Sequence, residues 1–332
     1  MQRSGPPRFD VALDRYGVGM SATERVEYDE FGLFHENAAE YGLPYDGPPA
    51  IRREHVEVEP GRRLSALVWG LGDPELVLLH GGSQNAHTWD TVAMALRPRS
   101  LIAIDLPGHG HSDGPGERQR ADRSPRGAAD DIAVVIRALA PNARGVVGMS
   151  YGGLTTIALT ECAPDVVRKV LLVDVLPGLK AEHARHIVDF VNGPATFARF
   201  DDLLARTMEF NPTRSISSLR RGILHNAVQL DDGSWVWRHS RWRLGADEHL
   251  ESEATPRGGA VFDDLLDTLG RIQVPLLLAR GMRPDSVLRD DDEAELMRRL
   301  PSAQVMHFEE AGHSIQGDMP VQLAATIQTF IP

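Results

Sequence analysis

The chain has 332 residues, a formal net charge of −12 at pH 7 and one cysteine. This length accommodates one large α/β domain with an inserted subdomain as well as it accommodates two domains. The acidic balance argues against nucleic acid as a partner, and one cysteine excludes an intramolecular disulfide. No apolar run approaches the length of a membrane span, and residues 1–10 lack the apolar stretch of a signal peptide, so we expect a cytoplasmic protein.

The first fifty residues are rich in glycine, proline and charge. They contain a possible short amphipathic helix over Ala22–Tyr41, which ends at the breakers Gly42-Leu43-Pro44. We interpret residues 1–50 as an N-terminal extension that packs on the main domain or contributes to a homodimer.

Strands and helices alternate from Ile51 onward. The expected strands are 51–58, 63–69, 76–79, 101–104, 145–149, 170–173, 274–279 and 304–308, and the expected helices are 88–96, 127–140, 154–162, 290–300 and 321–330. Several of these strands are fully apolar, which is typical of central strands buried on both faces. The alternation predicts a parallel sheet covered by helices on both faces.

The alternation stops between Leu176 and about Pro256, where the sequence is mostly helical and irregular. We interpret residues 176–260 as a cap subdomain inserted over the sheet, so that the core comprises residues 51–175 and 261–332. Four cap residues, Trp235, Trp237, His239 and Arg241, are candidates for substrate binding. The alternative, that the aromatic side chains only pack the cap onto the sheet, stays open.

The stretch around Ser150 matches the G-x-S-x-G pattern through Gly148 and Gly152. It lies between a short apolar strand and a helix-compatible segment, which is the context of a nucleophile elbow. In such a turn the strained backbone holds the serine hydroxyl out of the sheet, and small flanking residues let neighbouring backbone approach closely. Ser150 is therefore the candidate nucleophile.

A serine hydroxyl needs a base within hydrogen-bonding reach and a third group that orients that base. His313 follows the last expected strand and is the candidate base. Asp285 follows the penultimate strand and is the preferred acid, with Asp174, at the end of the sixth strand, as the alternative. The three aspartates at 290–292 are explained as the solvent-exposed first turn of a helix, where acidic residues are favourable.

Acyl transfer also needs donors for the negative charge that develops on the carbonyl oxygen. The backbone N–H groups of Tyr151 and Gly82 are the candidates, because one follows the nucleophile and the other lies in the glycine loop after the strand 76–79. The pair His109 and His111 has no nearby carboxylate or cysteine partners beyond Asp105 and Asp113, so we do not interpret it as a metal site.

Four segments, in order along residues 51–332, resemble the α/β-hydrolase superfamily, specifically the capped type that includes small esterases and carbon–carbon bond hydrolases. The matching segments are His80-Gly81, Asp105–Ser112, the Ser150 elbow and Ala311-Gly312-His313. The resemblance implies an eight-stranded, mostly parallel sheet, a cap between strands six and seven, no cofactor, and catalysis by Ser150, His313 and Asp285. A serine at the elbow argues against epoxide hydrolase and haloalkane dehalogenase chemistry.

The sequence thus predicts a serine hydrolase that cleaves a carboxylic ester, thioester or lactone of a small molecule through an acyl-enzyme. Hydrolysis of a carbon–carbon bond in a dienone or β-diketone by the same residues is the alternative reaction. A ligand receptor that keeps the hydrolase fold with little turnover is the alternative of a different class.

Overall fold

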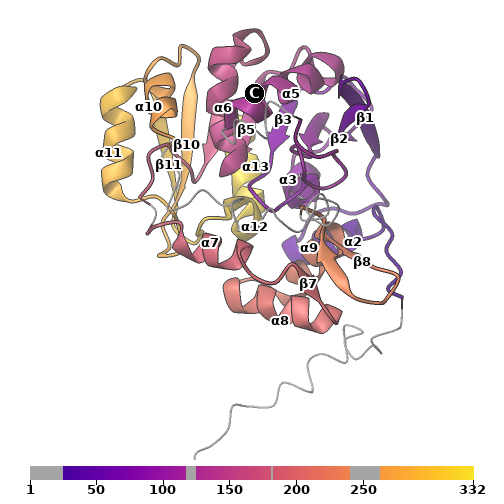
Figure 1. The fold of residues 1–332 in the computed structure, drawn as a ribbon. Coiled ribbons are helices and arrows are strands. Elements are labelled where there is room, and N and C mark those ends of the chain that lie inside the picture. The colour runs from indigo at the N-terminus through magenta and orange to yellow at the C-terminus, as the bar shows by residue number, and fades with distance from the viewer. Residues whose placement is uncertain (1–24, 117–124, 181, 240–261) are drawn as a thin grey trace, which may run out of the picture.

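The computed structural model describes residues 25–116, 125–180, 182–239 and 262–332. Its centre is an eight-stranded sheet with the order β1-β2-β4-β3-β5-β6-β10-β11 (Figure 1). Its strands are β1 (Ile51–Glu59), β2 (Arg62–Trp69), β3 (Leu76–Leu79), β4 (Leu101–Ile104), β5 (Gly145–Met149), β6 (Val170–Val173), β10 (Leu276–Gly281) and β11 (Gln304–Phe308). Only the β1–β2 and β2–β4 pairs are antiparallel. The predicted eight-stranded, mostly parallel sheet is confirmed.

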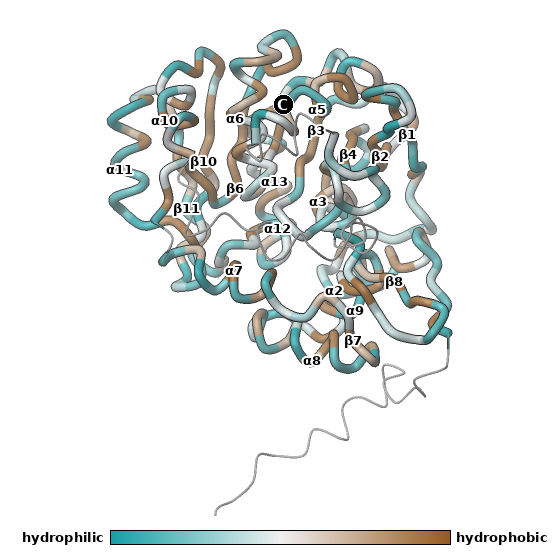
Figure 2. Tube along the Cα trace, in the orientation of Figure 1, coloured by the Kyte–Doolittle hydropathy of each residue, from teal (hydrophilic) through white to brown (hydrophobic). Residues whose placement is uncertain are grey.

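Alternating apolar side chains of the strands divide the core into two layers. Val77 and Leu79 point into a cluster formed with α5 (Pro125–Leu139), α6 (Tyr151–Cys162), α10 (Asp263–Gly270) and α11 (Asp290–Arg299). Leu76 and Leu78 point into a cluster on the opposite face, formed with α2 (Phe34–Tyr41), α3 (Asp90–Ala95) and α13 (Pro320–Phe330). Figure 2 shows hydrophobic colour concentrated on the central strands, as this three-layer arrangement requires.

Residues 182–239, within the stretch predicted as the cap, form a small subdomain below the sheet in the view of Figure 1. It contains the helices α7 (Arg185–Val191), α8 (Phe200–Phe210) and α9 (Ile216–Asn226), and a sheet of β7 (Thr196–Phe197), β9 (Trp235–Trp237) and β8 (Ala227–Gln229). The sequence indicated helical and irregular structure here. The sequence did not predict these strands because each has only two or three residues, which is too few for an alternation of apolar and polar residues to be recognised.

The N-terminal helix α2 begins at Phe34, and the described part of the expected helix before it is irregular. A turn replaces the helix at Asp29, whose side chain accepts a hydrogen bond from the Phe31 N–H and whose carbonyl accepts one from the Gly32 N–H. Such a side chain competes with helical hydrogen bonding.

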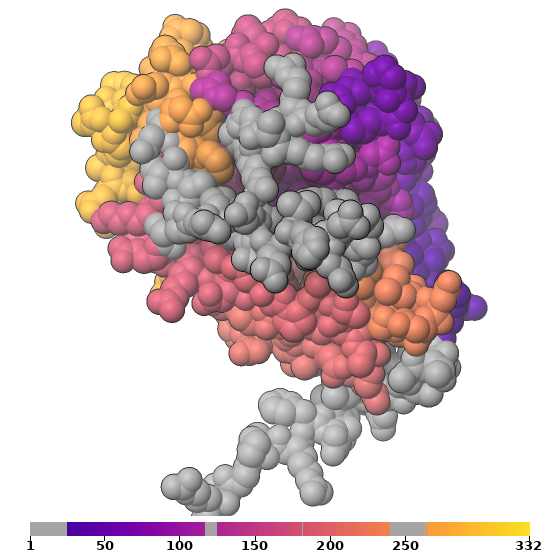
Figure 3. All heavy atoms as spheres, in the orientation of Figure 1, coloured from indigo at the N-terminus to yellow at the C-terminus, as the bar shows by residue number. Residues whose placement is uncertain are grey.

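Residues 25–41 connect the cap to the core. The Val26 N–H donates to the Gln229 side chain at 3.0 Å, and the Tyr28 hydroxyl is 2.8 Å from His225 Nδ1. In Figure 3 the indigo residues of this segment lie beside the orange residues of the β8 region. Glu36 and Glu40 of α2 form ion pairs with the buried Arg221 of α9.

None of the helices in the described ranges is long and apolar enough to cross a membrane.

Candidate active site

Ser150 occupies a strained turn between β5 and α6. Its backbone has φ of 50° and ψ of −121°, in a region that residues with a side chain rarely adopt. The Ser150 carbonyl accepts hydrogen bonds from the Gly153 and Leu154 N–H groups, so the helix starts immediately after the serine. This local structure is the elbow that the G-x-S-x-G pattern indicates.

The two glycines of the pattern are required by close backbone contacts. A Cβ at Gly148 would lie 2.4 Å from the Gly152 carbonyl oxygen, and a Cβ at Gly152 would lie 2.5 Å from the carbonyl oxygens of His80 and Leu79. Neither contact is sterically possible without a shift of the backbone. The glycines therefore bring β5, α6 and the loop after β3 together around Ser150.

His313 is held by Asp174. The two side chains are joined by a 2.9 Å hydrogen bond between His313 Nδ1 and Asp174 Oδ2. Asp174 is fully buried at the end of β6, and its other hydrogen bonds come from the Gly281 N–H, the Ser286 hydroxyl and the Val287 N–H. With donors at both oxygens, the carboxylate is fixed in a position that orients the imidazole.

The structure contradicts the prediction that Asp285 is the acid next to His313. The Asp285 side chain is 48% exposed and forms an ion pair with Arg283 at 3.0 Å. The loop after β10 instead contributes the two residues that follow Asp285, because Ser286 and Val287 donate hydrogen bonds to Asp174. The alternative weighed from the sequence, Asp174, occupies the position predicted for Asp285.

Ser150 and Asp174 lie at the same edge of the sheet, where Asp174 is hydrogen-bonded to His313. β5 and β6 are adjacent parallel strands with Met149 paired to Val173, so Ser150 and Asp174 follow neighbouring strand ends. The Ser150 N–H also donates to the Val173 carbonyl at 3.3 Å. No hydrogen bond joins the Ser150 hydroxyl to His313 among the contacts of the described residues, and in free enzymes such contacts are often long.

The loop after β3 runs beside the elbow. A Cβ at Gly81 would lie 3.2 Å from Ser150 Cβ, and one at Gly82 would lie 4.0 Å from Tyr151 Cβ. The Gly81 N–H already donates to the Gln84 side chain at 3.1 Å, which leaves Gly82 as the better candidate for an oxyanion donor. Ser83 has a positive φ of 61°, and its N–H donates to His109 Nε2. His109 thus supports this loop.

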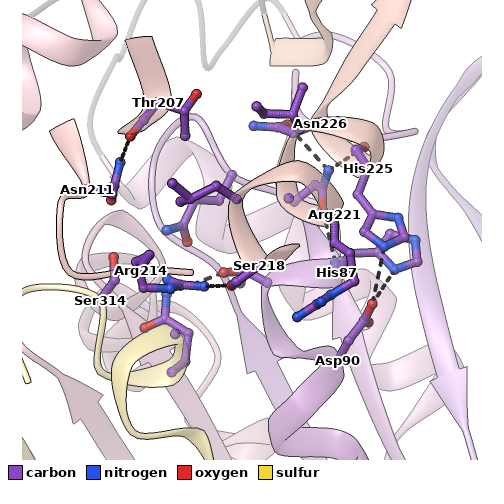
Figure 4. Close-up of a pocket in the computed structure, with 18 of the residues that line it drawn as sticks. His87, Asp90, Thr207, Asn211, Arg214, Ser218, Arg221, His225, Asn226 and Ser314 are labelled. Carbon is purple, nitrogen blue, oxygen red and sulfur yellow. Dashed lines mark hydrogen bonds and ion pairs between the residues drawn. The ribbon is translucent and has the colours of Figure 1, made fainter. Parts of the chain in front are cut away.

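A cavity of about 190 Å³ lies between core and cap (Figure 4), and its wall includes neighbours of the candidate site in sequence but neither Ser150 nor His313. Its wall includes Ser83 from the loop after β3 and Ser314, which follows His313. Trp237 and His239 also contribute to the wall, whereas Trp235 is buried in the cap core against Phe200. The candidate Arg241 lies outside the described residues.

Arg214 was not anticipated from the sequence, although it faces the same cavity. Its guanidinium donates to the Ser218 hydroxyl at 2.5 Å and lies beside Gly317, where a Cβ would be 1.9 Å from Arg214 Nη1. Its Nε is buried without a hydrogen-bond partner, and no carboxylate of the described residues forms an ion pair with it. No feature of the sequence distinguishes Arg214 from arginines that lie on the protein surface.

Comparison with known proteins gives a consistent result. The family model of the alpha/beta hydrolase family matches residues 76–326. Esterase Rv0045c of Mycobacterium tuberculosis is 40% identical over 317 residues, which cover 93% of this chain and 98% of that protein. A pimeloyl-[acyl-carrier protein] methyl ester esterase of Aeromonas salmonicida is 27% identical over 260 residues, covering 78% of this chain and 95% of the relative.

Solved structures agree with this assignment. A structure of the M. tuberculosis esterase Rv0045c, described together with its inhibition by transition metals, has a TM-score of 0.74 at 39% identity and covers 92% of this chain and 99% of that one. E-2-(acetamidomethylene)succinate hydrolase, at 23% identity, shares the fold with a TM-score of 0.69 over 85% of this chain and 99% of its own. The sheet, the family match and the 40% identical relative together show that the chain belongs to the alpha/beta hydrolase family.

Proposed function

We propose that this hydrolase cleaves a carboxylic ester, thioester or lactone of a small molecule, with Ser150 as nucleophile, His313 as base and Asp174 as the acid that orients His313. The observation that carries the proposal is the 2.9 Å hydrogen bond between His313 Nδ1 and the fully buried Asp174. The similarity to two esterases supports the choice of ester substrates.

In the first half of the reaction His313 Nε2 accepts the Ser150 proton as the serine oxygen attacks the substrate carbonyl carbon. Asp174 keeps the proton of His313 on Nδ1, so that Nε2 is free to act as the base. The N–H groups of Gly82 and Tyr151 would stabilise the oxyanion. Collapse of the intermediate expels the alcohol or thiol, which takes the proton from His313, and leaves an acyl group on Ser150.

In the second half His313 takes a proton from water while the water oxygen attacks the acyl-enzyme. A second oxyanion forms at the same donors, the bond to Ser150 breaks, and the proton returns to the serine oxygen. The products are the carboxylic acid and the free enzyme. No step requires a metal or an organic cofactor.

The test is hydrolysis of a panel of short-chain nitrophenyl esters, thioesters and lactones by the purified chain and by Ser150→Ala. We expect turnover by the native chain and a loss of roughly 10⁴-fold or more in kcat for the variant. Equal activity of the two proteins would exclude Ser150 as the nucleophile.

Two further measurements separate the alternatives. Labelling of Ser150 by a fluorophosphonate without steady-state turnover on any substrate would favour a ligand receptor. Cleavage of a β-diketone or dienone in preference to every ester would identify a carbon–carbon bond hydrolase instead.

A further inference from the structure

A cluster of metal-ligand side chains lies on one wall of the cavity, apart from Ser150 and His313. His87 belongs to the 3-10 helix η2 (Ala86–Trp89), Asp90 begins α3, and His225 lies in the last turn of α9. All three side chains are buried and contribute to the cavity wall. Figure 4 shows both imidazole rings close to the Asp90 carboxylate.

The distances within the cluster fit one ion. His87 Nδ1 is 2.9 Å from Asp90 Oδ2, and His225 Nε2 is 3.7 Å from the same oxygen. The ligand atoms of the three residues all lie within 4.8 Å of one another. Nitrogen and oxygen ligands at about 2.0 Å from a tetrahedral ion are separated by about 3.3 Å, so the spacing of the three ligand atoms is close to that of such a site.

The outer nitrogens of both rings have partners of the kind that surround metal-bound histidines. His87 Nε2 is 3.1 Å from the Glu30 carboxylate, and His225 Nδ1 is 2.8 Å from the Tyr28 hydroxyl. Such contacts fix the ring orientation and the tautomer, leaving the inner nitrogen available to the metal. Both partners come from the N-terminal segment, which passes behind the cluster.

Two further features distinguish the cluster from an ordinary ion pair. Asp90 Oδ1 is buried without a hydrogen-bond partner, so one ligand oxygen is unused. The His87 and His225 rings, which are stacked 3.8 Å apart at an interplanar angle of 9°, both reach the same carboxylate; because a bound ion lies in the plane of each imidazole, one ring must rotate out of the stack to coordinate it. A buried polar atom without a partner calls for an explanation, and a bound ion is one.

We propose that His87 Nδ1, the Asp90 carboxylate and His225 Nε2 bind one divalent transition-metal ion of the Zn²⁺ or Co²⁺ type. Two imidazoles and one carboxylate favour such ions over Mg²⁺ or Ca²⁺, which prefer oxygen ligands. Binding replaces the proton shared between His87 and Asp90, and links the cap helix α9 to η2 and α3 of the core.

This connection between α9 and the core lies close to the loop after β3. The Asn85 side chain donates to the His225 carbonyl at 2.8 Å, and the Asn226 side chain donates to the Ser83 carbonyl at 2.6 Å. An ion at the cluster therefore holds α9 against the loop that carries Gly82. This connection predicts that the metal changes the position of the cap relative to that loop as well as the stability of the chain.

The test uses the full chain, first treated with EDTA and then freed of chelator, and it needs no substrate. Titration with Co²⁺ is followed by visible absorption, and Zn²⁺ binding by calorimetry. We expect one ion per chain and a higher Tm with metal. His225→Gln and Asp90→Asn should each weaken Zn²⁺ binding at least tenfold, whereas His186→Gln, at an exposed cap position, should leave binding unchanged.

Tyr28→Phe keeps all three ligands and removes only the hydroxyl beside His225. Loss of such an outer contact is expected to weaken metal binding by about 10- to 100-fold with little change in the metal-free Tm. This variant keeps the test valid if the ligand variants fold poorly. The proposal is wrong if the native chain binds no ion, or if His225→Gln and Tyr28→Phe bind Zn²⁺ as tightly as the native chain. Either result would leave the cluster as a buried ion-pair network only.

Discussion

At the scale of single residues, Asp174 and Asp285 offer a direct test of the site. Asp174→Asn removes the charge that holds the His313 tautomer, and we expect kcat to fall by roughly 10³- to 10⁴-fold on a good ester. Asp285→Asn is the matched control, because this residue is half exposed and pairs only with Arg283 among the described residues. We expect it to change kcat by less than about fivefold.

The measurement is steady-state kinetics of both variants on the same ester. The assignment of Asp174 fails if Asp285→Asn causes the larger loss.

Arg214 should favour substrates that carry a negative charge. Its guanidinium lies in the cavity wall beside Gly317, and its buried Nε lacks a partner. Charge-assisted hydrogen bonds to a carboxylate are about twice as strong as neutral ones. We therefore expect Arg214→Met to lower kcat/KM about tenfold or more for an ester with a second, free carboxylate, with little change for a neutral ester of the same length.

Arg185→Met is the control, since Arg185 is an exposed cap residue that pairs weakly with Asp189 at 3.9 Å. Equal losses on the charged and neutral esters for Arg214→Met would show that the residue contributes to packing and not to recognition.

At the scale of structural elements, the contact between α6 and the loop after β3 depends on Gly152. Gly152→Ala places a methyl group 2.5 Å from two backbone oxygens, so the helix or the loop must move. We expect a loss of about 1–3 kcal/mol in the free energy of unfolding, which denaturant titration measures. Gly222→Ala in α9 meets no atom within 4 Å and should stabilise the chain by about 0.5–1 kcal/mol.

The core elements could be predicted from the sequence because their patterns are local. Leu76–Leu79 and Val170–Val173 are continuous apolar runs, and the structure forms strands at those residues. The elbow was readable for the same reason, since the turn conformation of Ser150 and the flanking glycines lie within five residues of one another.

The identity of the acid and the cluster in the cavity wall could not be predicted, because both depend on contacts between residues that are far apart in the sequence. Asp174 and Asp285 both follow a parallel strand, and the structure separates them through hydrogen bonds from Ser286 and Val287. His225 lies 138 positions after His87 in the chain, and the ring separation of 3.8 Å depends on how α9 docks on the core. The i, i+3 spacing of His87 and Asp90 was the one signal of that cluster present in the sequence.

At the scale of the whole molecule, burial of neutral histidines makes the chain sensitive to acid. Burial lowers the pKa of His80 from 6.5 to about 3. Its Nε2 accepts a hydrogen bond from the Leu106 N–H, so the folded chain requires the neutral ring. Below pH 6.5 the unfolded chain therefore binds a proton that the folded chain does not, and stability decreases as the pH falls from 6.5 towards 3.

The expected contribution is a slope of about 1.4 kcal/mol per pH unit for this one proton, in the lower part of that range. Urea unfolding of the native chain and of His80→Gln between pH 5 and 7 measures it. The variant should show a smaller dependence on pH, whatever its stability at pH 7. Identical slopes would mean that His80 is not the group responsible.

Because residues 25–41 contact the cap, the chain can finish folding only after the cap residues have been synthesised. Val26 and Tyr28 emerge from the ribosome early, yet their partners Gln229 and His225 lie 203 and 197 residues later. At about 5–20 residues per second, the N-terminal segment waits roughly 10–40 s before those partners exist. During that interval the apolar side chains that later cover the cap are available to chaperones or to other nascent chains.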